Sequence, residues 1–274
     1  EYAEKTVYIS DGLLDACGSY ELYLNKLARE IAPIRMTGNY GGEVLRSVRA
    51  FKAVPTFENS LEPDFKTYIR EAVETFADVS RGNRLTFSVF KQAPWAGCGR
   101  LAVEQSQVTM RTPYMDNDLV ALVYRAPEAA TTTVDVQLQL IADCNPALAR
   151  IFTDRGVGLS NIPLFSVIAR RYYEFLIKAD YYCNHGMPHW LAKLDNTLSP
   201  LHLERLILGY NKFHHYRVWF RSELAHYVLN ILSDKRTSER PYLNERFIKN
   251  ILSEHLRGNK NYTHEIHMVL TLEL

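Results

Sequence analysis

The sequence lacks an excess of charge of one sign, a long apolar run and paired cysteines. Its 32 Lys and Arg nearly balance its 31 Asp and Glu, which argues against recruitment by nucleic acid or by an anionic membrane. No apolar run approaches the roughly twenty residues that span a bilayer, and the charged first residues do not resemble a signal peptide. The four cysteines are far apart, which predicts reduced thiols in a cytoplasmic protein: Cys17, Cys98, Cys144 and Cys183.

Helical periodicity is what the sequence has in abundance. Apolar residues recur at helical spacing, and residues typical of helix ends lie between these segments. Pro33 ends a predicted helix and Pro63 opens the next. Asp116 and Asn244 are predicted N-caps, and Gly258 follows the end of the helix that Asn244 begins. The predicted helices cover 20–31, 63–81, 117–126, 134–143, 164–182, 189–198, 201–232 (one helix or a pair), 245–257 and the residues from Thr263 onward.

The predicted fold class is therefore mainly α, with very few strands. Residues 85–89 alternate as in a strand but also fit a helix that runs to Pro94, and both interpretations stay open. The chain is long enough for one large domain or two modest ones. A soft boundary is predicted at the turn 156–160.

A glycine-rich turn follows a short apolar run that ends at Met36 and precedes a helical pattern that begins at Val44. A strand, a glycine turn and a helix in this order place backbone N–H groups and a helix N-terminus at one point, which favours a bound anion such as phosphate. The alternative is a turn that only connects the two elements. The turn reads Thr37-Gly38-Asn39-Tyr40-Gly41-Gly42-Glu43.

Several segments resemble the synthetase domain of glutamine-dependent asparagine synthases. The turn at 37–43 matches that family's Ser-Gly-(Asp/Glu)-Gly-(Gly/Ala)-Asp-Glu, and the run from Arg111 to Val120 matches its Arg-x-Pro-Phe-Leu-Asp-x-x-Leu-Val. Trp95 and Gly99-Arg100 stand where the family has a Trp and an Asp-Arg pair. The run 219–224 and the closing segment 255–274 resemble its Trp-x-(Arg)-x-Glu-Leu and its C-terminal motifs.

The resemblance implies that residues 1–274 are the C-terminal part of an α/β, PP-loop synthetase domain, with a subgroup insertion at about 160–200. It implies amide formation from a small-molecule acid through an acyl-adenylate, with ammonia from glutamine. ATP and Mg²⁺ would serve the full-length parent. The family's Ser-Gly-Gly-x-Asp-Ser loop does not occur in this sequence, so we expect the PP-loop half and the glutaminase domain upstream and no tight nucleotide binding by the chain alone.

Carried over residue by residue, the resemblance assigns cofactor contacts to the turn, catalytic roles to Glu43 and Lys212, and substrate positioning to Arg111 and Asp116. The cofactor-binding residues would be Thr37, Gly38, Asn39, Gly41 and Gly42. Gly42 replaces a metal-binding Asp of the family, and no metal ligand is predicted here. The family's active-site lysine aligns either with Gly156 or, with a gap, near Lys212.

Each of these assignments has a structural alternative. Arg111 would pair with a carboxylate, and Asp116 would cap the following helix. The helix dipole would favour the negative charge of Glu43 near the helix N-terminus whatever its function. Lys212 would lie on an aromatic-rich surface. Cys183, His185 and His189 have zinc-like spacing but lack a fourth ligand. The alternative to an enzyme is a non-catalytic helical binding or assembly module. We also expect association with a second copy through apolar faces.

Overall fold

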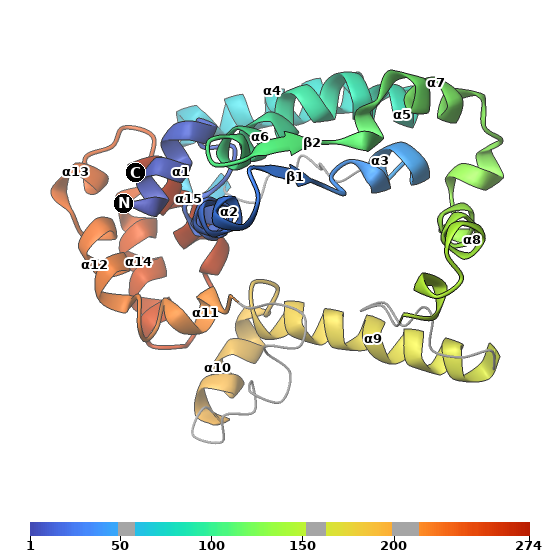
Figure 1. Cartoon of the computed structure of the whole chain (residues 1–274). Helices are drawn as coiled ribbons and strands as arrows, with labels where there is room; N and C mark the ends of the chain where they lie inside the picture. Colours follow the sequence, from blue (N-terminus) through green and yellow to red (C-terminus); the bar gives the residue numbers. More distant parts are fainter. Residues whose placement is uncertain (49–57, 152–162, 199–213) are drawn as a thin grey trace. The chain divides into compact units, whose positions relative to one another are not determined.

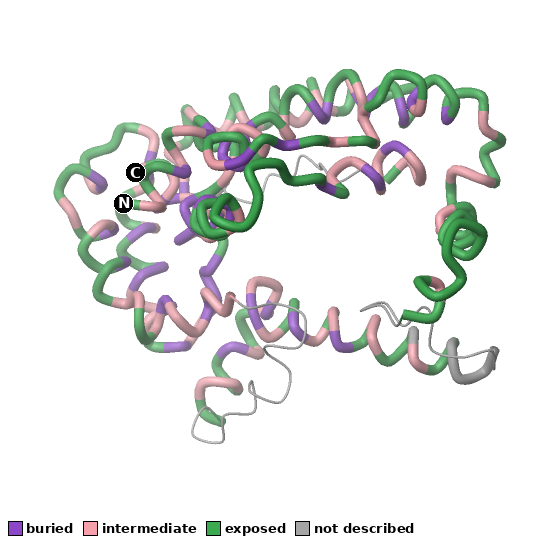
Figure 2. Tube along the Cα trace, in the orientation of Figure 1, coloured by how far each residue is buried: buried purple, intermediate pink, exposed green. Residues whose placement is uncertain are grey.

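The computed structural model describes residues 1–48, 58–151, 163–198 and 214–274. Within these ranges the protein is mainly helical and has one small sheet, so the predicted fold class is confirmed at this level (Figure 1). The chain forms two compact units, Glu1–Val136 with His267–Leu274, and Gln137–Ile266. The division falls within α8 (Asp135–Cys144), a helix exposed along most of its length (Figure 2). The predicted boundary at 156–160 lies outside the residues that the structure describes.

The first unit contains two short parallel strands, β1 (Ile34–Met36) and β2 (Thr109–Arg111). Ile34 pairs with Thr109, and the Thr37 N–H continues the ladder by donating to the Arg111 carbonyl at 2.9 Å. The carboxyl ends of the two strands therefore lie side by side. Its helices are α1 (Tyr2–Ser10), α2 (Ser19–Ile31), α3 (Gly41–Arg46), α4 (Pro63–Val79), α5 (Arg84–Phe87), α6 (Cys98–Gln105), α7 (Asn117–Arg125) and, from His267 onward, α15 (Thr263–Glu273).

The helix ends of this unit follow the local sequence. Pro63 is the first residue of α4, and α2 stops before Pro33. The Asp116 carboxylate accepts hydrogen bonds from the N–H groups of Asp118 and Leu119, so it caps α7 as predicted.

Residues 84–105 are helical throughout, which decides between the two interpretations of 85–89. A wide π-helical segment, η3 (Ser88–Gly97), joins α5 to α6 and contains Pro94. A proline lacks the N–H that an α-helix needs, and a π-type turn is one way for the helix to continue past it. The helix therefore does not stop at Pro94.

A hydrophobic core fixes α3 against its neighbours in the first unit. Val44 is completely buried and clusters with Leu85, Val120 and Val123 from α5 and α7. The ring of Tyr40, at the start of α3, packs on the edge of this cluster. The core thereby holds the glycine turn in place.

The regular elements of the second unit are helices, among its described residues. They are α9 (Pro163–Cys183), α10 (His189–Leu198), α11 (Tyr216–Trp219), α12 (Ala225–Leu232), α13 (Lys235–Ser238) and α14 (Glu245–Leu256), with α8 and the start of α15 at its ends. Asn244 caps α14, and Gly258 has a φ of 73° just past its end, both as predicted. The described part of 201–232 is broken into α11 and α12. No described helix in either unit has the length and apolar character needed to cross a membrane.

Candidate functional site

The glycine turn after β1 is closed by its own hydrogen bonds. The Asn39 N–H donates to the Thr37 hydroxyl at 3.2 Å, and the Gly41 N–H donates to the Gly38 carbonyl at 3.1 Å. Tyr40 has a φ of 68°, and α3 begins at the next residue. Two N–H groups of the predicted phosphate cradle are therefore already bonded inside the turn.

A pocket of about 270 Å³ opens beside this turn. Asn39, Tyr40 and Glu43 line it from the turn and the start of α3, and other lining residues come from η3 and α6. A methyl group on Gly97 would collide with the Tyr40 hydroxyl, so glycine is needed there for the ring to occupy its place. The remaining lining residues are Leu13, Leu14, Gln92, Ala96, Gly97 and Arg100.

The pocket presents one carboxylate and one guanidinium, those of Glu43 and Arg100. Asn39 and Gln92 add amide groups, and Tyr40 adds a hydroxyl. Burial first, and then the nearby carboxylate of Glu43, raise the pKa of the Tyr40 phenol, which is therefore a neutral hydrogen-bond donor at physiological pH. The lining suits a small molecule that carries both a negative and a positive charge.

Behind this lining lies Glu104, a carboxyl group of α6 that is only 3% exposed. Asn39 donates a long hydrogen bond of 3.5 Å to its Oε2 atom. Burial, followed by the charge of Glu21, raises the pKa of Glu104 against the opposing effects of Arg35 and Arg100. A carboxyl group with a raised pKa next to a pocket is a typical feature of functional sites.

The run from Arg111 to Val120 contacts the turn through the Arg111 carbonyl and the Tyr114 ring, and not through the predicted side chains of Arg111 and Asp116. The Arg111 carbonyl receives the Thr37 N–H, while the Arg111 side chain is exposed and does not line the pocket. The ring of Tyr114 lies over Gly41, where an added Cβ would come within 2.9 Å of the ring. Asp116 is exposed and its carboxylate caps α7. For Asp116 the structural alternative is therefore confirmed.

Two further predicted site residues, Gly42 and Lys212, are not among the described residues that line the pocket. Gly42 lies in the first turn of α3 beside Arg46, and Lys212 lies outside the described residues. The Nδ1 atom of His189 accepts the Asn261 N–H at 3.3 Å. The group of potential metal ligands found among the described residues is a different one, Asp15, Cys17 and His267.

Sequence reasoning missed Glu104, Gln92 and the two leucines of the pocket. Leu13 and Leu14 come from the turn after α1 and reach the pocket only in three dimensions. A side chain on Gly99, where the resembling family has Asp, would collide with Leu13. This contact gives a packing reason for that departure. The available sequence signal for Glu104 was weak, a charged residue directly after the apolar run Leu101-Ala102-Val103.

The second unit holds a different polar cluster, centred on the buried guanidinium of Arg217. It donates to the Cys183 carbonyl at 2.6 Å and to Asp195 at 2.8 Å. Asn261 is also buried, and its amide nitrogen lies 3.0–3.1 Å from the carbonyl oxygens of Asn184, His185 and Met187, which share its two hydrogens. These side chains bind backbone groups and the Asp195 carboxylate, which indicates a structural role.

Compared with protein-family models, with curated proteins and with solved structures, the chain matches none of them. The resemblance to asparagine synthases therefore depends on the quoted motifs alone.

Proposed function

We propose that this chain carries the acid-binding part of an ATP-dependent, amide-forming ligase that resembles asparagine synthases. One observation carries the proposal: three of the resembling segments, far apart in sequence, converge at the carboxyl ends of β1 and β2. The turn 37–43 and Arg100 line one pocket, and the run that follows Arg111 supports the turn through Tyr114. The carboxyl ends of parallel strands are where α/β proteins commonly bind ligands.

The substrate class that fits the pocket is an α-amino acid. The Arg100 guanidinium would bind a carboxylate and the Glu43 carboxylate would bind the ammonium group, while the Tyr40 hydroxyl donates to an oxygen. Leu13 and Leu14 supply the apolar part of the lining. For the family that the chain resembles, this acid is aspartate.

The residues present do not fit ATP and Mg²⁺. The N–H groups of Asn39 and Gly41 are bonded within the turn, and Gly42 stands where the family has a metal-binding acid. Glu43 is the single carboxylate among the lining residues of this pocket. We therefore assign no phosphate or metal contact to this chain, and the parent enzyme would supply the nucleotide loop from another segment.

Isothermal titration of the 274-residue chain with L-aspartate tests the proposal. We expect saturable binding that needs both charges of the ligand, so succinate, which lacks the ammonium group, binds less well. Arg100→Met and Glu43→Gln should each weaken binding roughly tenfold to a hundredfold, because each removes a charged hydrogen bond worth about 1.5–3 kcal/mol. The matched control is Arg70→Met, an exposed arginine of α4, which should bind as the unaltered chain does.

Absence of binding by aspartate, asparagine and a panel of other amino acids would overturn the amino-acid site. Equal affinity in the Arg100→Met variant would overturn the assigned pose. For the parent enzyme, the expected result is amino-acid-dependent release of AMP and pyrophosphate from ATP.

A second candidate function is a non-catalytic binding or assembly module descended from such a ligase. The closed turn and Gly42 favour it, because both remove features of a nucleotide site. Calorimetry of the parent with ATP and Mg²⁺ separates the two, since a module without catalysis would show no Mg²⁺-dependent nucleotide binding.

A further inference from the structure

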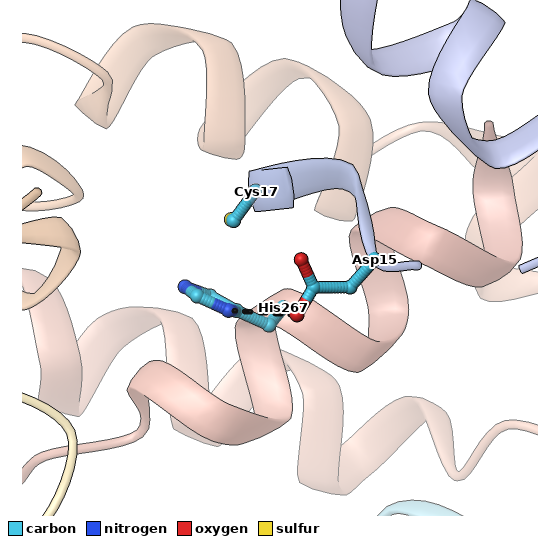
Figure 3. Close-up of side chains that lie close together, drawn as sticks. All are labelled: Asp15, Cys17 and His267. Carbon is cyan, nitrogen blue, oxygen red and sulfur yellow. Dashed lines mark ion pairs between the residues drawn. The ribbon is translucent and has the colours of Figure 1, made fainter. Parts of the chain in front are cut away.

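Three side chains of different chemistry meet in the first unit although they come from opposite parts of the sequence. Asp15 and Cys17 lie at the short helical turn η1 (Ala16–Gly18), and His267 lies on α15. One ligand atom from each, a carboxylate oxygen, the sulfur and an imidazole nitrogen, all lie within 4.8 Å of one another. The Cys17 side chain and the Asp15 carboxylate both point toward the His267 ring (Figure 3).

Hydrogen bonds between η1 and α15 hold these three side chains close together. The Ala16 N–H donates to the Thr271 hydroxyl at 3.1 Å, and this hydroxyl donates to the His267 carbonyl at 2.8 Å. One Asp15 oxygen, Oδ1, accepts the Gly18 N–H at 2.9 Å, which fixes the carboxylate and leaves Oδ2 directed at His267. Hydrogen bonds through Thr271, one helical turn after His267, therefore connect η1 to α15 close to the cluster.

The separation between Asp15 and His267 is that of two ligands sharing an ion. The Asp15 Oδ2 and His267 Nδ1 atoms are 3.6 Å apart, which is too long for a good hydrogen bond. Zinc bonds of about 2.0–2.3 Å in tetrahedral geometry place ligand atoms roughly 3.3–3.7 Å from each other. Closing the cluster onto an ion requires movements of about 1 Å or less at the sulfur.

Burial at the cluster is that of a metal site with an entry path. Cys17 and His267 are buried, whereas the Asp15 side chain is 49% exposed and gives access from solvent.

We propose that Asp15, Cys17 and His267 bind one zinc ion, with water as the fourth ligand. A thiolate, an imidazole and a carboxylate together suit zinc, whereas Mg²⁺ and Ca²⁺ prefer oxygen ligands alone. The site is independent of the proposed amino-acid pocket, since the residue sets share no member. A bound ion would link the residues before α2 to the last helix of the chain.

Titration of the metal-free, reduced 274-residue chain with Zn²⁺ against a chromophoric chelator tests the site. We expect one ion per chain and a higher thermal unfolding midpoint with Zn²⁺, because the ion binds the folded state. Loss of hydrogen-bond partners around metal ligands already costs about tenfold to a hundredfold in affinity, so Cys17→Ser and His267→Gln should each weaken binding by more than tenfold. The matched control is Cys144→Ser, an exposed cysteine of α8, which should retain full affinity.

Co²⁺ provides a readout that does not depend on the variants. Cobalt bound to the unaltered chain should give a thiolate-to-cobalt charge-transfer band, and X-ray absorption of the zinc-loaded chain should give one sulfur neighbour. No Zn²⁺ binding, or bound zinc without a sulfur ligand, would overturn the proposal. So would equal affinity in the folded Cys17→Ser variant. The Arg100→Met variant should bind Zn²⁺ normally, so failure of the amino-acid pocket and failure of the zinc site are distinguishable.

Discussion

The pocket beside Tyr40 and the cluster around Arg217 both gather polar side chains, but they use them differently. In the second unit, Arg217 and Asn261 are buried and their donors bind backbone carbonyls and one carboxylate. In the first unit, Glu43 and Arg100 face a cavity and are both accessible to solvent. Polar side chains that bind the backbone stabilise a fold, whereas those that face a cavity remain available to a ligand.

This difference decides which motif matches carry functional weight. The Trp219 segment also resembles the asparagine-synthase pattern, yet its neighbour Arg217 binds groups of α9 and α10 and so holds α9, α10 and α11 together. Arg100 lines a cavity, so its match supports a binding role better. The predictions below test this division by stability in one region and by ligand binding in the other.

The largest expected effect is on stability, from Arg217→Met. The change removes the hydrogen bonds to Cys183 and Asp195 and leaves their oxygens without the guanidinium, which should cost about 3 kcal/mol. Urea unfolding followed by circular dichroism measures the loss. Arg236→Met is the control, because Arg236 is 84% exposed and its ion pair with Asp234 lies on the surface, so it should cost no more than about 0.5 kcal/mol. Similar losses in the two variants would break the comparison.

Asn261→Ala should have the next largest effect, about 2 kcal/mol. Its amide nitrogen lies within hydrogen-bond distance of three buried or partly buried carbonyls, and its oxygen accepts the Thr263 N–H at the start of α15. The variant removes these hydrogen bonds. Asn250→Ala, at an exposed position of α14, should change the free energy of unfolding by no more than about 0.5 kcal/mol. A loss below that of Asn250→Ala would contradict a structural role for the cluster.

Features set by neighbouring residues could be predicted from the sequence. The caps at Asp116 and Asn244, the start of α4 at Pro63 and the left-handed Gly258 each depend on side chains within a few positions. The path through Pro94 could not be decided, because a π-helical segment has no periodic signature that separates it from its alternatives.

The site was predictable only in part, because it is assembled from distant segments. Motif matching found the turn 37–43 and the Arg100 pair, but not which of their side chains face a cavity. Leu13 and Glu104 carry no motif, and their place depends on how α1 and α6 pack. The proposed zinc ligands were even less predictable from the sequence, because Cys17 and His267 lie at opposite ends of the chain and no local spacing relates them.

A smaller effect is expected from Gly97→Ala, which fills the space of the Tyr40 hydroxyl. The ring must move, which should cost about 1 kcal/mol of stability and weaken amino-acid binding, because Tyr40 lines the pocket. Gly38→Ala is the matched control, since an added Cβ there meets nothing within 4 Å. Calorimetry and urea unfolding of both variants measure the difference. Unchanged binding in folded Gly97→Ala would show that the Tyr40 position does not matter to the ligand.

The smallest effect on the free energy of unfolding at any one pH is expected from Glu104→Gln. The way this effect changes with pH shows whether Glu104 resembles the pocket residues or the Arg217 cluster. Glu104 is buried like Arg217 but lies behind a pocket, with a pKa raised by burial and by Glu21. Between the ordinary and the raised pKa, the folded chain holds a proton that the unfolded chain has lost, so stability falls as pH rises through this window. Glutamine does not ionise, and its amide oxygen still accepts the Asn39 hydrogen bond.

The free energy of unfolding of Glu104→Gln, minus that of the unaltered chain, should therefore increase from pH 4 to pH 8. Subtraction removes the other titrating groups, Asp15 among them, because both proteins contain them. Glu74→Gln, at an exposed position of α4, should give a difference without this rise. A flat difference for Glu104→Gln would mean that its carboxylate is as well accommodated as the Arg217 guanidinium, so Glu104 would belong with the structural cluster. A rise would mean that the fold keeps a destabilised carboxylate next to a cavity, as expected for a group kept for function.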